Sequence, residues 1–466
     1  MKKPYQPVTA TVLNELVALV GAENLSTSET DRSQRAFDVS SHAPHLSEVV
    51  VWPQTAAQVA AVLKYANDQL IPVTAWGAGT SVEGNPIPLF GGILLSTEKM
   101  PHTIQIHADD LQVTVEAGKK YKDLNQELEP LGLFFPPDPG GDATIGGMLA
   151  NNAAGPKAVK YGACKDNVLR CQVALADGRL IQVGSRSIKQ SSGYDLLHLF
   201  VGSEGTLGVI TEATLKLLPL PKFASAVVAS FDTVTAAVQA VVKIKGSGLD
   251  PAALEFIDAQ TIDMINQVGG LSLDQNHTLF MEFHATHEAA LHLGLEKVKR
   301  ICADLGARTF TATTDPAERK QLWFGRHHAY DYAQQWYADK KLLTLDAAIP
   351  ISHYPEIVAQ IEQGLVKHRV SGHMLGHAGD GNMHVLLPYD DSNYDRAVAF
   401  HRELIQRALE LGGTATGEHG VGIGKIGYMQ QEHGPALDVM RSIKQTLDPN
   451  FILNPGKIFP SERTSS

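Results

Sequence analysis

The order of apolar and polar positions in the first 222 residues predicts alternating strands and helices. In Thr55–Asp68, the apolar residues Val59, Leu63 and Ala66 recur on one face, which is the period of a helix with one buried side. Short apolar runs before and after this helix predict strands, so the region contains a strand–helix–strand unit. An amphipathic helix is expected near the N-terminus. Strands are expected at Glu48–Trp52, Ile71–Ala75, Gly92–Ser96, Gln112–Glu116, Val168–Ala176 and Arg179–Val183, and a helix at Tyr121–Leu131.

The second half of the chain shows a different alternation of strands and helices. The Leu-Pro-Leu-Pro stretch Leu218–Pro221 is typical of a domain border. Helices are predicted beyond it at Thr233–Lys245, Asp258–Gln267, Glu288–Leu305, Pro316–Lys340, Ile351–Arg369, Asp395–Leu411 and Ala436–Thr446. Strands are predicted at Ala252–Ile257, Thr278–Ala285, Arg308–Thr313 and Leu342–Ile349. This order favours an antiparallel sheet covered by helices, which is an α+β domain.

The length and charge of the chain restrict its class. At 466 residues it is too long for one ordinary core, and two or three domains are expected. A formal net charge of −11 argues against nucleic acid or an acidic membrane as the main partner. No run of about 18 uncharged apolar residues is present, and the N-terminus lacks the apolar core of a signal peptide. Cys164, Cys171 and Cys302 fit neither a zinc spacing nor a disulfide framework, so free thiols in a reducing cytoplasm are expected.

Glycine-rich segments recur at element boundaries in the first half. They are Trp76–Gly84, residues 136–162 and Val201–Ile210. Their spacing differs from the G-x-G-x-x-G of a nicotinamide-binding turn, although glycines at strand ends let backbone N–H groups approach a phosphate. Asp142 is the expected N-cap of a short helix in the second segment. One such loop has little weight, but three within about 140 residues suggest a long ligand that runs through the domain.

Two histidines flank an Asp-Gly pair in the segment Gly376–His384. If Asp380 and Gly381 form a two-residue hairpin turn, His377 lies directly opposite His384. Opposed residues have their Cβ atoms about 5 Å apart, so the two imidazoles would converge on one ion. A lone histidine is more often satisfied by ordinary hydrogen bonds, and this remains the alternative for the pair.

A carboxylate and a third imidazole follow at Glu418 and His419. Together with the histidine pair they make a donor set suited to Zn²⁺, Mn²⁺ or Fe²⁺ as a Lewis acid. The flanking glycines permit a bend in which Glu418 reaches the ion and His419 faces the substrate. Arg326 and Tyr330 stand at i, i+4 of the predicted Pro316–Lys340 helix, and an arginine there suits a substrate carboxylate. The alternatives are a solvated helix face for Arg326 and a metal-dependent hydrolase for the whole set.

Seven motifs in this order resemble a known family. They are the Gly77–Gly84 loop, PPDPGGDATIGGMLANNAAG, Tyr161-Gly162, VGSEGTLGVIT, GHAGDGNMH, GEHGVG and NPGK. The chain is similar over residues 45–460 to the FAD-linked D-2-hydroxyacid dehydrogenases of the vanillyl-alcohol-oxidase superfamily. The resemblance is strongest to the acceptor-linked D-lactate dehydrogenases and to the FAD subunit of glycolate oxidase.

The resemblance implies an α+β protein with a PCMH-type FAD-binding domain of two α/β subdomains and an α+β cap domain with an antiparallel sheet. The expected division is an N-terminal helical segment 1–41, the FAD domain 42–222, a cap and substrate domain 223–420 with the metal site, and a C-terminal segment 421–466 that returns to the FAD domain. Thr80 stands where covalent flavoenzymes of the superfamily place a histidine, so the FAD is expected to be noncovalent.

The resemblance also assigns site residues. His377, His384 and Glu418 would bind the metal, His419 would be the catalytic base, and Arg326 would hold the substrate carboxylate. The expected FAD-binding residues are Trp76, Gly77, Ala78, Gly79, Thr80, Ser81, Gly84, Pro137, Asp138, Thr144, Gly146, Gly147, Asn151, Ala153, Gly155, Tyr161, Glu204, Gly208, Ile210 and Asn454.

The activity that the resemblance implies is the oxidation of a D-2-hydroxy acid, D-lactate first, with glycolate and D-2-hydroxyglutarate as alternatives. The hydroxyl would lose its proton with help from the metal, and FAD would take the hydride. Electrons would pass to an acceptor other than NAD or oxygen: a quinone, a cytochrome, an electron-transferring flavoprotein or a partner subunit. A cytoplasmic location or an association with the inner face of a membrane is expected. A non-catalytic subunit that only binds FAD is a further alternative.

Overall fold

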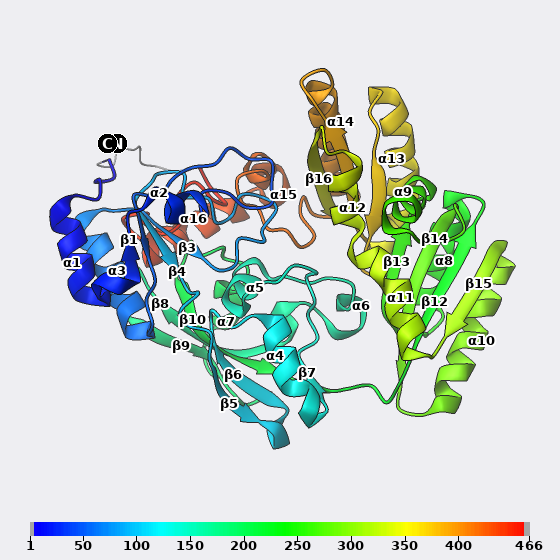
Figure 1. The fold of residues 1–466 in the computed structure, drawn as a ribbon, viewed down its shortest axis with the longest axis horizontal. Coiled ribbons are helices and arrows are strands. Elements are labelled where there is room, and N and C mark those ends of the chain that lie inside the picture. The colour runs from blue at the N-terminus through cyan, green and yellow to red at the C-terminus, as the bar shows by residue number, and fades with distance from the viewer. Residues whose placement is uncertain (1–3, 461–466) are drawn as a thin grey trace. The chain divides into compact units, whose positions relative to one another are not determined.

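The computed structural model describes residues 4–460 and divides them into two compact units (Figure 1). The first unit contains residues 4–154, 163–220 and 418–460, and the second contains residues 155–162 and 221–417. The first unit therefore includes the N-terminal segment, the predicted FAD domain without residues 155–162 and 221–222, and the C-terminal segment together with residues 418–420 of the predicted cap domain. No helix among the described residues is long and apolar enough to cross a membrane.

The first unit is built on two sheets. The first sheet has the order β1-β2-β4-β3, in which β2, β4 and β3 are parallel and β1 is antiparallel to β2. The second sheet has the order β5-β6-β10-β8-β9 and is antiparallel throughout. The strands are β1 (Leu25–Ser26), β2 (Val49–Val51), β3 (Val73–Trp76), β4 (Ile93–Ser96), β5 (Thr103–His107), β6 (Gln112–Glu116), β8 (Val168–Ala174), β9 (Leu180–Gly184) and β10 (Val209–Lys216), with a small pair of β7 (Leu133–Phe134) and β11 (Leu218–Pro219).

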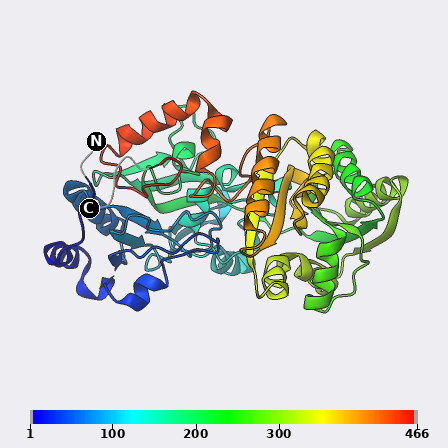
Figure 2. The ribbon, with the colours of Figure 1, turned by 90° about the horizontal axis from the view of Figure 1, so that it is seen from above.

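Helices of the first unit cover these sheets. They are α1 (Ala10–Val20), α2 (Glu29–Ser33), α3 (Ala56–Gln69), α4 (Tyr121–Leu128), α5 (Ile145–Asn151), α7 (Leu197–Phe200), α15 (Met429–His433) and α16 (Ala436–Leu447). Helix α3 is capped by Thr55, whose hydroxyl accepts the N–H of Gln58 at 3.2 Å, and the apolar face of the helix packs on the first sheet together with α1. The C-terminal helices α15 and α16, red-orange in Figure 2, come back to this unit.

The C-terminal segment is held to the first sheet by backbone hydrogen bonds. Val73 in β3 donates to Ile452 O at 2.8 Å, and the N–H of Asn454 donates to Val73 O at 2.7 Å. Residues from the end of the chain thus extend the edge of a sheet whose strands come from its beginning. This arrangement places Asn454 beside Val73 in β3, the strand that leads into the first glycine-rich segment.

The second unit is one seven-stranded antiparallel sheet of order β15-β12-β14-β13-β17-β18-β16. Its strands are β12 (Phe223–Phe231), β13 (Pro251–Ile257), β14 (His277–Ala285), β15 (Ala307–Thr313), β16 (Lys341–Ala348), β17 (His373–Gly376) and β18 (Asn382–Tyr389). Its helices are α6 (Ala158–Tyr161), α8 (Val234–Gly246), α9 (Ala259–Gly269), α10 (Glu288–Asp304), α11 (Pro316–His327), α12 (Ala329–Trp336), α13 (Tyr354–His368) and α14 (Tyr394–Glu410).

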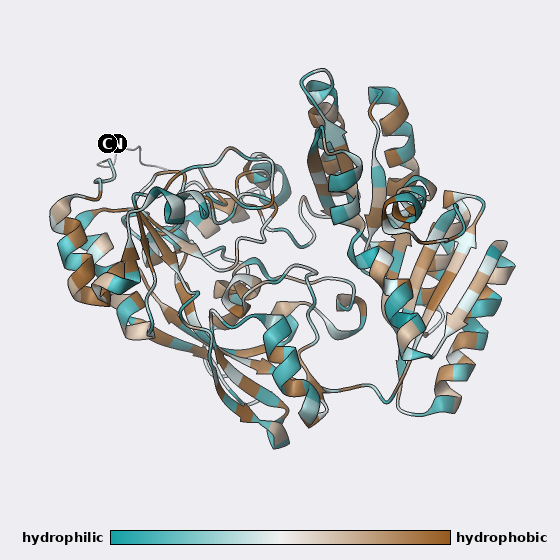
Figure 3. Ribbon diagram, viewed as in Figure 1, coloured by the Kyte–Doolittle hydropathy of each residue, from teal (hydrophilic) through white to brown (hydrophobic). Residues whose placement is uncertain are grey.

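Helices bury both faces of this sheet. The apolar core on one face includes residues of α8, α10, α13 and α14, and the core on the other includes residues of α9, α11 and α12. In Figure 3 the strands of this sheet are mainly brown to white with some teal residues, whereas the helices show mixed teal and brown faces. The predicted antiparallel sheet and α+β class are confirmed.

Two details of the predicted elements are wrong. The helix expected at Pro316–Lys340 is two helices, because His328 leaves the helical conformation with φ −98° and ψ 9°. Arg326 and Tyr330 consequently lie in different helices and do not share a helix face. The strands β5 and β12 were not predicted, although β12 pairs with two neighbours in the middle of the second unit.

Candidate active site

A cavity of about 220 Å³ lies inside the first unit, among the three glycine-rich segments. The segments approach one another closely: a Cβ atom at Gly77 would lie 2.4 Å from the hydroxyl oxygen of Thr144. That hydroxyl accepts the N–H of Gly147 at 3.3 Å as the N-cap of α5, so it cannot turn away without losing the cap. The prediction that Asp142 caps this helix is therefore wrong. The Asp142 carboxylate instead pairs with Lys120 Nζ at 2.6 Å.

Most of the predicted FAD-binding positions line this cavity. These are Trp76, Gly77, Ala78, Gly79, Thr80, Ser81, Thr144, Gly146, Gly147, Asn151, Ala153, Glu204, Gly208, Ile210 and Asn454. Sequence reasoning had not named other lining residues: Val82, Asn85, Pro86, Thr97, Met148, Ala150 and Ser203. The cavity walls thus combine backbone with small side chains, which suits a long, partly flat cofactor.

Five predicted FAD-binding positions lie outside the cavity lining: Gly84, Pro137, Asp138, Gly155 and Tyr161. The N–H of Gly84 donates to an Asp38 carboxylate oxygen at 2.7 Å, and Asp138 accepts a bond of 2.8 Å from the Tyr121 hydroxyl.

Gly155 and Tyr161 belong to the second unit. The hydroxyl of Tyr161 lies there 2.6 Å from Nδ1 of His284, and burial raises the pKa of this tyrosine. A role in FAD binding for these residues stays a prediction.

Glu204 joins the cavity wall to the segment that follows His419. Its carboxylate accepts the N–H of Val421 at 2.6 Å, the N–H of Gly422 at 2.8 Å and an amide hydrogen of Asn85 at 2.6 Å. Burial raises the pKa of Glu204 above its ordinary value in spite of these hydrogen bonds. The structure therefore gives the Glu204 side chain a role in holding the chain near the expected base.

A buried lysine lies in the same part of the first unit. Burial lowers the pKa of Lys457 to about 7, and its Nζ donates to Ile87 O at 2.6 Å and lies 3.3 Å from Asn454 Oδ1. The amide of Asn454 in turn donates to Glu204 O at 2.7 Å. Asn454 is thus oriented on the cavity wall by bonds on both sides of its side chain.

Glu418 and His419 line the same cavity of the first unit. Their side chains are 14% and 16% exposed, and His419 Nε2 lies 4.0 Å from Glu418 Oε1. The next residue, Gly420, has φ +81°, and a Cβ atom there would lie 2.8 Å from Asn85 and 2.9 Å from Glu204. Glycine is required at this turn, and the turn directs the expected base to the expected flavin cavity.

The predicted hairpin register of the histidine pair is wrong. His384 in β18 lies opposite Leu375 in β17, and His377 lies in the connection between the strands, which includes a 3₁₀ turn at Ala378–Asp380 and Gly381 at φ +73°. The connection is longer than a two-residue turn because the chain folds back through this helical turn. The two imidazoles nevertheless lie close, with ring centroids 5.2 Å apart and planes at 86°.

Glu255 was not singled out from the sequence, and it contacts two predicted site residues. This fully buried carboxylate in β13 accepts bonds from Arg326 Nε at 2.9 Å, Arg326 Nη2 at 2.6 Å and His377 Nδ1 at 2.9 Å. Burial would raise the pKa of Glu255, but the electrostatic interactions and hydrogen bonds with His377 and Arg326 outweigh burial and hold it below its ordinary value. The signal in the sequence was a single acidic residue inside an apolar strand, which seldom occurs without a partner.

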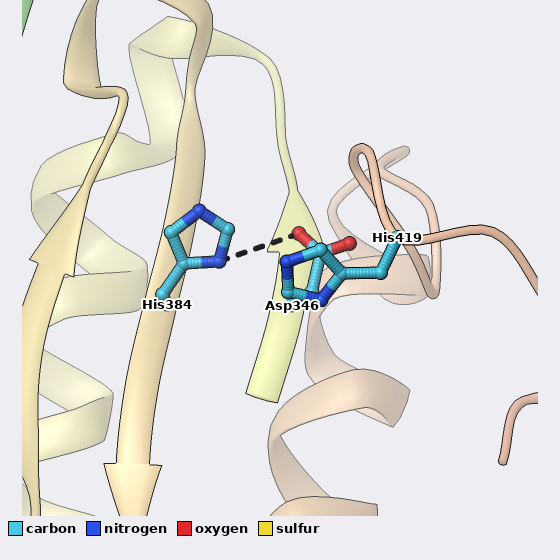
Figure 4. Close-up of side chains that lie close together, drawn as sticks. All are labelled: Asp346, His384 and His419. Atoms are coloured by element: carbon cyan, nitrogen blue, oxygen red, sulfur yellow. Dashed lines mark ion pairs between the residues drawn. The ribbon is translucent and has the colours of Figure 1, made fainter. Parts of the chain in front are cut away.

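Asp346 is a second buried carboxylate that sequence reasoning missed. It faces His384 across the β16–β18 pair, with Asp346 Oδ1 3.7 Å from His384 Nδ1 (Figure 4). It also accepts bonds from the Asn382 amide at 2.7 Å, the Thr416 hydroxyl at 2.9 Å and the N–H of Gly417 at 2.8 Å. A Cβ atom at Gly417 would lie 2.1 Å from Asn382 Nδ2, so this position requires glycine.

The chain has the PCMH-type fold, and a family model described as "FAD binding domain" matches within it. Solved structures with this fold match nearly the whole chain. The structure of p-cresol methylhydroxylase matches with a TM-score of 0.80 at 16% identity, and 99% of both chains is covered. For 4-ethylphenol oxidase from Gulosibacter chungangensis, the TM-score is 0.79 at 18% identity, with 98% of this chain and 99% of that chain covered. At such identities the likeness concerns the fold alone.

Family models and curated relatives give a closer assignment. A model described as "FAD linked oxidases, C-terminal domain" matches residues 220–458, and one described as "FAD binding domain" matches residues 47–184. The chain belongs to the FAD-linked oxidase family. The family predicted from the seven motifs is thereby confirmed.

Curated relatives whose names state an activity are identical to this chain at about a third of the aligned positions. A D-lactate dehydrogenase of Archaeoglobus fulgidus is 37% identical, with 89% of this chain and 93% of the relative covered. A mitochondrial D-lactate dehydrogenase (cytochrome) of Arabidopsis thaliana is 35% identical, with 99% and 82% covered. The glycolate oxidase subunit GlcD of Bacillus subtilis is 33% identical, with 98% of both covered.

Proposed function

We propose that this chain is an FAD-dependent dehydrogenase that oxidises D-lactate, or a close D-2-hydroxy acid, to the 2-oxo acid. The observation that carries the proposal is the similarity over nearly the full chain to relatives named D-lactate dehydrogenase. Glycolate is the second candidate substrate, because a glycolate oxidase subunit matches over 98% of both chains. The acceptor is a cytochrome, a quinone or an electron-transferring flavoprotein, and the cytochrome is favoured by the name of the plant relative.

The cavity residues of the first unit fit FAD. Glycines at the segment crossings leave backbone amides accessible, and Thr80 in place of a histidine leaves the cofactor without a covalent bond. When bound, FAD supplies a two-electron acceptor for the hydride that leaves C2 of the substrate. Trp76–Ser81, the Thr144–Ala153 segment and Asn454 would hold it.

The donor set of His377, His384 and Glu418 fits a divalent metal, Zn²⁺ or else Mn²⁺ or Fe²⁺. His377 presents Nε2, since its Nδ1 faces the Glu255 carboxylate. Glu418 follows directly on Gly417, whose N–H is held by Asp346, the residue opposite His384. Glu418 is thus bonded to a residue that is itself held beside His384, and its Cα atom lies about 3.8 Å from that of Gly417. When bound, the metal lowers the pKa of the substrate hydroxyl as a Lewis acid.

The chain's own residues would complete the reaction. The Arg326 guanidinium binds the substrate carboxylate, and this contact fixes the hydroxyl-bearing carbon. A ring nitrogen of His419 takes the hydroxyl proton as general base. The substrate loses one proton and one hydride, which together convert the alcohol carbon into the carbonyl of the 2-oxo acid.

The proposal is tested by mixing the protein with candidate substrates in the absence of oxygen and following the flavin absorbance. The purified, FAD-containing protein should lose its flavin absorbance on addition of D-lactate and keep it with L-lactate, and glycolate in a parallel cuvette ranks the second candidate. Treatment with a chelator should lower turnover with cytochrome or quinone analogues while the flavin stays bound. A flavin band that no 2-hydroxy acid bleaches, or hydrolytic product release without an acceptor, would overturn the proposal.

A further inference from the structure

Glu255 is a buried charge in a place that an apolar residue would fill. It is 0% exposed and lies in β13, whose neighbours Leu254 and Phe256 are fully buried. A carboxylate buried in this way costs several kcal/mol in lost hydration, and a well-packed hydrophobic residue is often as stable or more so. Stability alone therefore does not explain a glutamate at this position.

The contacts of Glu255 determine how Arg326 can act. Both short bonds come from one edge of the guanidinium, from Nε and Nη2, to the single oxygen Oε2. The planar guanidinium has five N–H groups, so its far end, with the Nη1 hydrogens and the second Nη2 hydrogen, stays available for a carboxylate. Glu255 thus fixes the plane of the guanidinium and leaves one bidentate edge for a ligand.

The same carboxylate determines the tautomer of His377. A carboxylate only accepts hydrogen bonds, so the Nδ1 atom 2.9 Å from both carboxylate oxygens carries the proton. The lone pair is then on Nε2, which is the form in which a histidine binds a metal.

We propose that Glu255 is a positioning residue shared by the substrate clamp Arg326 and the metal ligand His377. The inference rests on the proposed function, in which these two residues bind the substrate carboxylate and a divalent metal. Arg326 lies in the last turn of helix α11 and His377 follows strand β17, so no local structure fixes their separation. The Glu255 carboxylate, which bonds both residues, fixes this separation. Its loss should weaken the binding of the substrate carboxylate and of the metal together.

The test measures metal affinity and substrate affinity separately in the full-length, FAD-containing protein. Glu255→Gln keeps the size of the side chain, but it removes the charge and replaces one acceptor oxygen with an N–H₂ donor. Metal affinity should fall about 10- to 100-fold, as is usual when a ligand histidine loses its carboxylate partner. It is read by titrating Zn²⁺ into metal-free protein against a chromophoric chelator. The KM for D-lactate, at saturating metal, should rise about tenfold or more, with unchanged flavin content.

Three variants serve as comparisons. Arg326→Lys should raise KM and leave metal affinity unchanged, since a point charge does not replace the fork. His377→Ala should lower metal affinity. Asp346→Asn is the matched control, because this equally buried carboxylate contacts Thr416 and Gly417 but not Arg326. It should lower metal affinity through Gly417 and leave KM at saturating metal unchanged.

Glu255→Asp is a second variant that allows the test to be made if Glu255→Gln does not fold. It keeps the charge and withdraws the carboxylate by one methylene, about 1.5 Å. Both readouts should move in the direction of the glutamine variant, and wild-type values in both would overturn the shared role. A Glu255 variant that changes only one readout also overturns it. If Arg326→Lys and His377→Ala leave both readouts at wild-type values, the proposed function fails instead.

Discussion

The two units offer binding groups of different kinds. The first unit presents glycine backbone and small side chains around a cavity, and a single Cβ atom at Gly77 would already collide with Thr144. The second unit presents charged side chains on an apolar sheet, where Glu255 and Asp346 are buried behind the histidines. Backbone recognition needs close approach, whereas recognition by buried charges needs compensation within the core.

The two units should also differ in which substitutions lower their free energy of unfolding. Removing a partner from a buried ion pair leaves an uncompensated charge and costs about 3–5 kcal/mol, so the second unit should be sensitive to changes of charge. The first unit should be sensitive to added volume, because protein interiors are close-packed and overpacking costs about 1–3 kcal/mol. The first unit also contains buried ionisable groups, among them Glu204, Lys444, Asp448 and Lys457, and a change of charge should be costly at these positions too.

The largest effect is expected from His419→Ala, which separates chemistry from binding. Loss of a general base typically costs about 10²–10⁴-fold in rate, so reduction of the flavin by D-lactate should slow by that range. FAD content and metal affinity should stay at wild-type values, because in the proposed function the His419 side chain, which lines the cavity, acts as base and not as metal ligand. Stopped-flow absorbance gives the rate, and flavin reduction at the wild-type rate would remove His419 from its assigned role.

A smaller effect is expected from Gly77→Ala, which adds volume to the first unit. The new methyl would overlap the Thr144 hydroxyl that caps α5, and FAD affinity should fall roughly tenfold or more, in line with an overpacking cost of about 1–3 kcal/mol. Isothermal titration of the apoprotein with FAD measures it. Gly427→Ala is the control, since no atom lies within 4 Å of its added Cβ. Equal affinities in the two variants would contradict the role of close approach in this cavity.

The smallest effect concerns pH and the buried lysine of the first unit. The pKa of Lys457 falls from its ordinary 10.5 to about 7, so between these values the unfolded chain binds one proton more than the folded one. The free energy of unfolding should therefore rise with pH in this window, by at most about 1.4 kcal/mol per pH unit. Lys457→Met should flatten this rise between pH 7 and 9 in urea unfolding followed by flavin fluorescence. Lys64→Met, at an exposed site, should keep it, and identical slopes in all three proteins would sink the assignment.

The predicted elements and the actual structure differ most where tertiary contacts decide. Thr55, Thr233 and Asp258 cap helices that begin within a residue of their predicted starts, because capping is a local interaction. The break at His328 and the 3₁₀ turn after His377 follow no such local signal. The Asp-Gly pair predicted a two-residue hairpin, and the chain instead makes a longer connection that still brings the two rings together.

Patterns along the chain were sufficient to identify the family, the α+β class, the antiparallel sheet of the second unit and the glycine-rich segments that line the cavity. These follow from hydrophobic period and from motifs in which each residue acts through its immediate neighbours. Three contacts became visible only in the folded chain: Glu255 bonds both Arg326 and His377, Asp346 accepts the N–H of Gly417, and Glu204 accepts the N–H groups that follow His419. These three carboxylates find their partners across about 70 to 220 residues of chain, and no local pattern encodes a contact over such a separation.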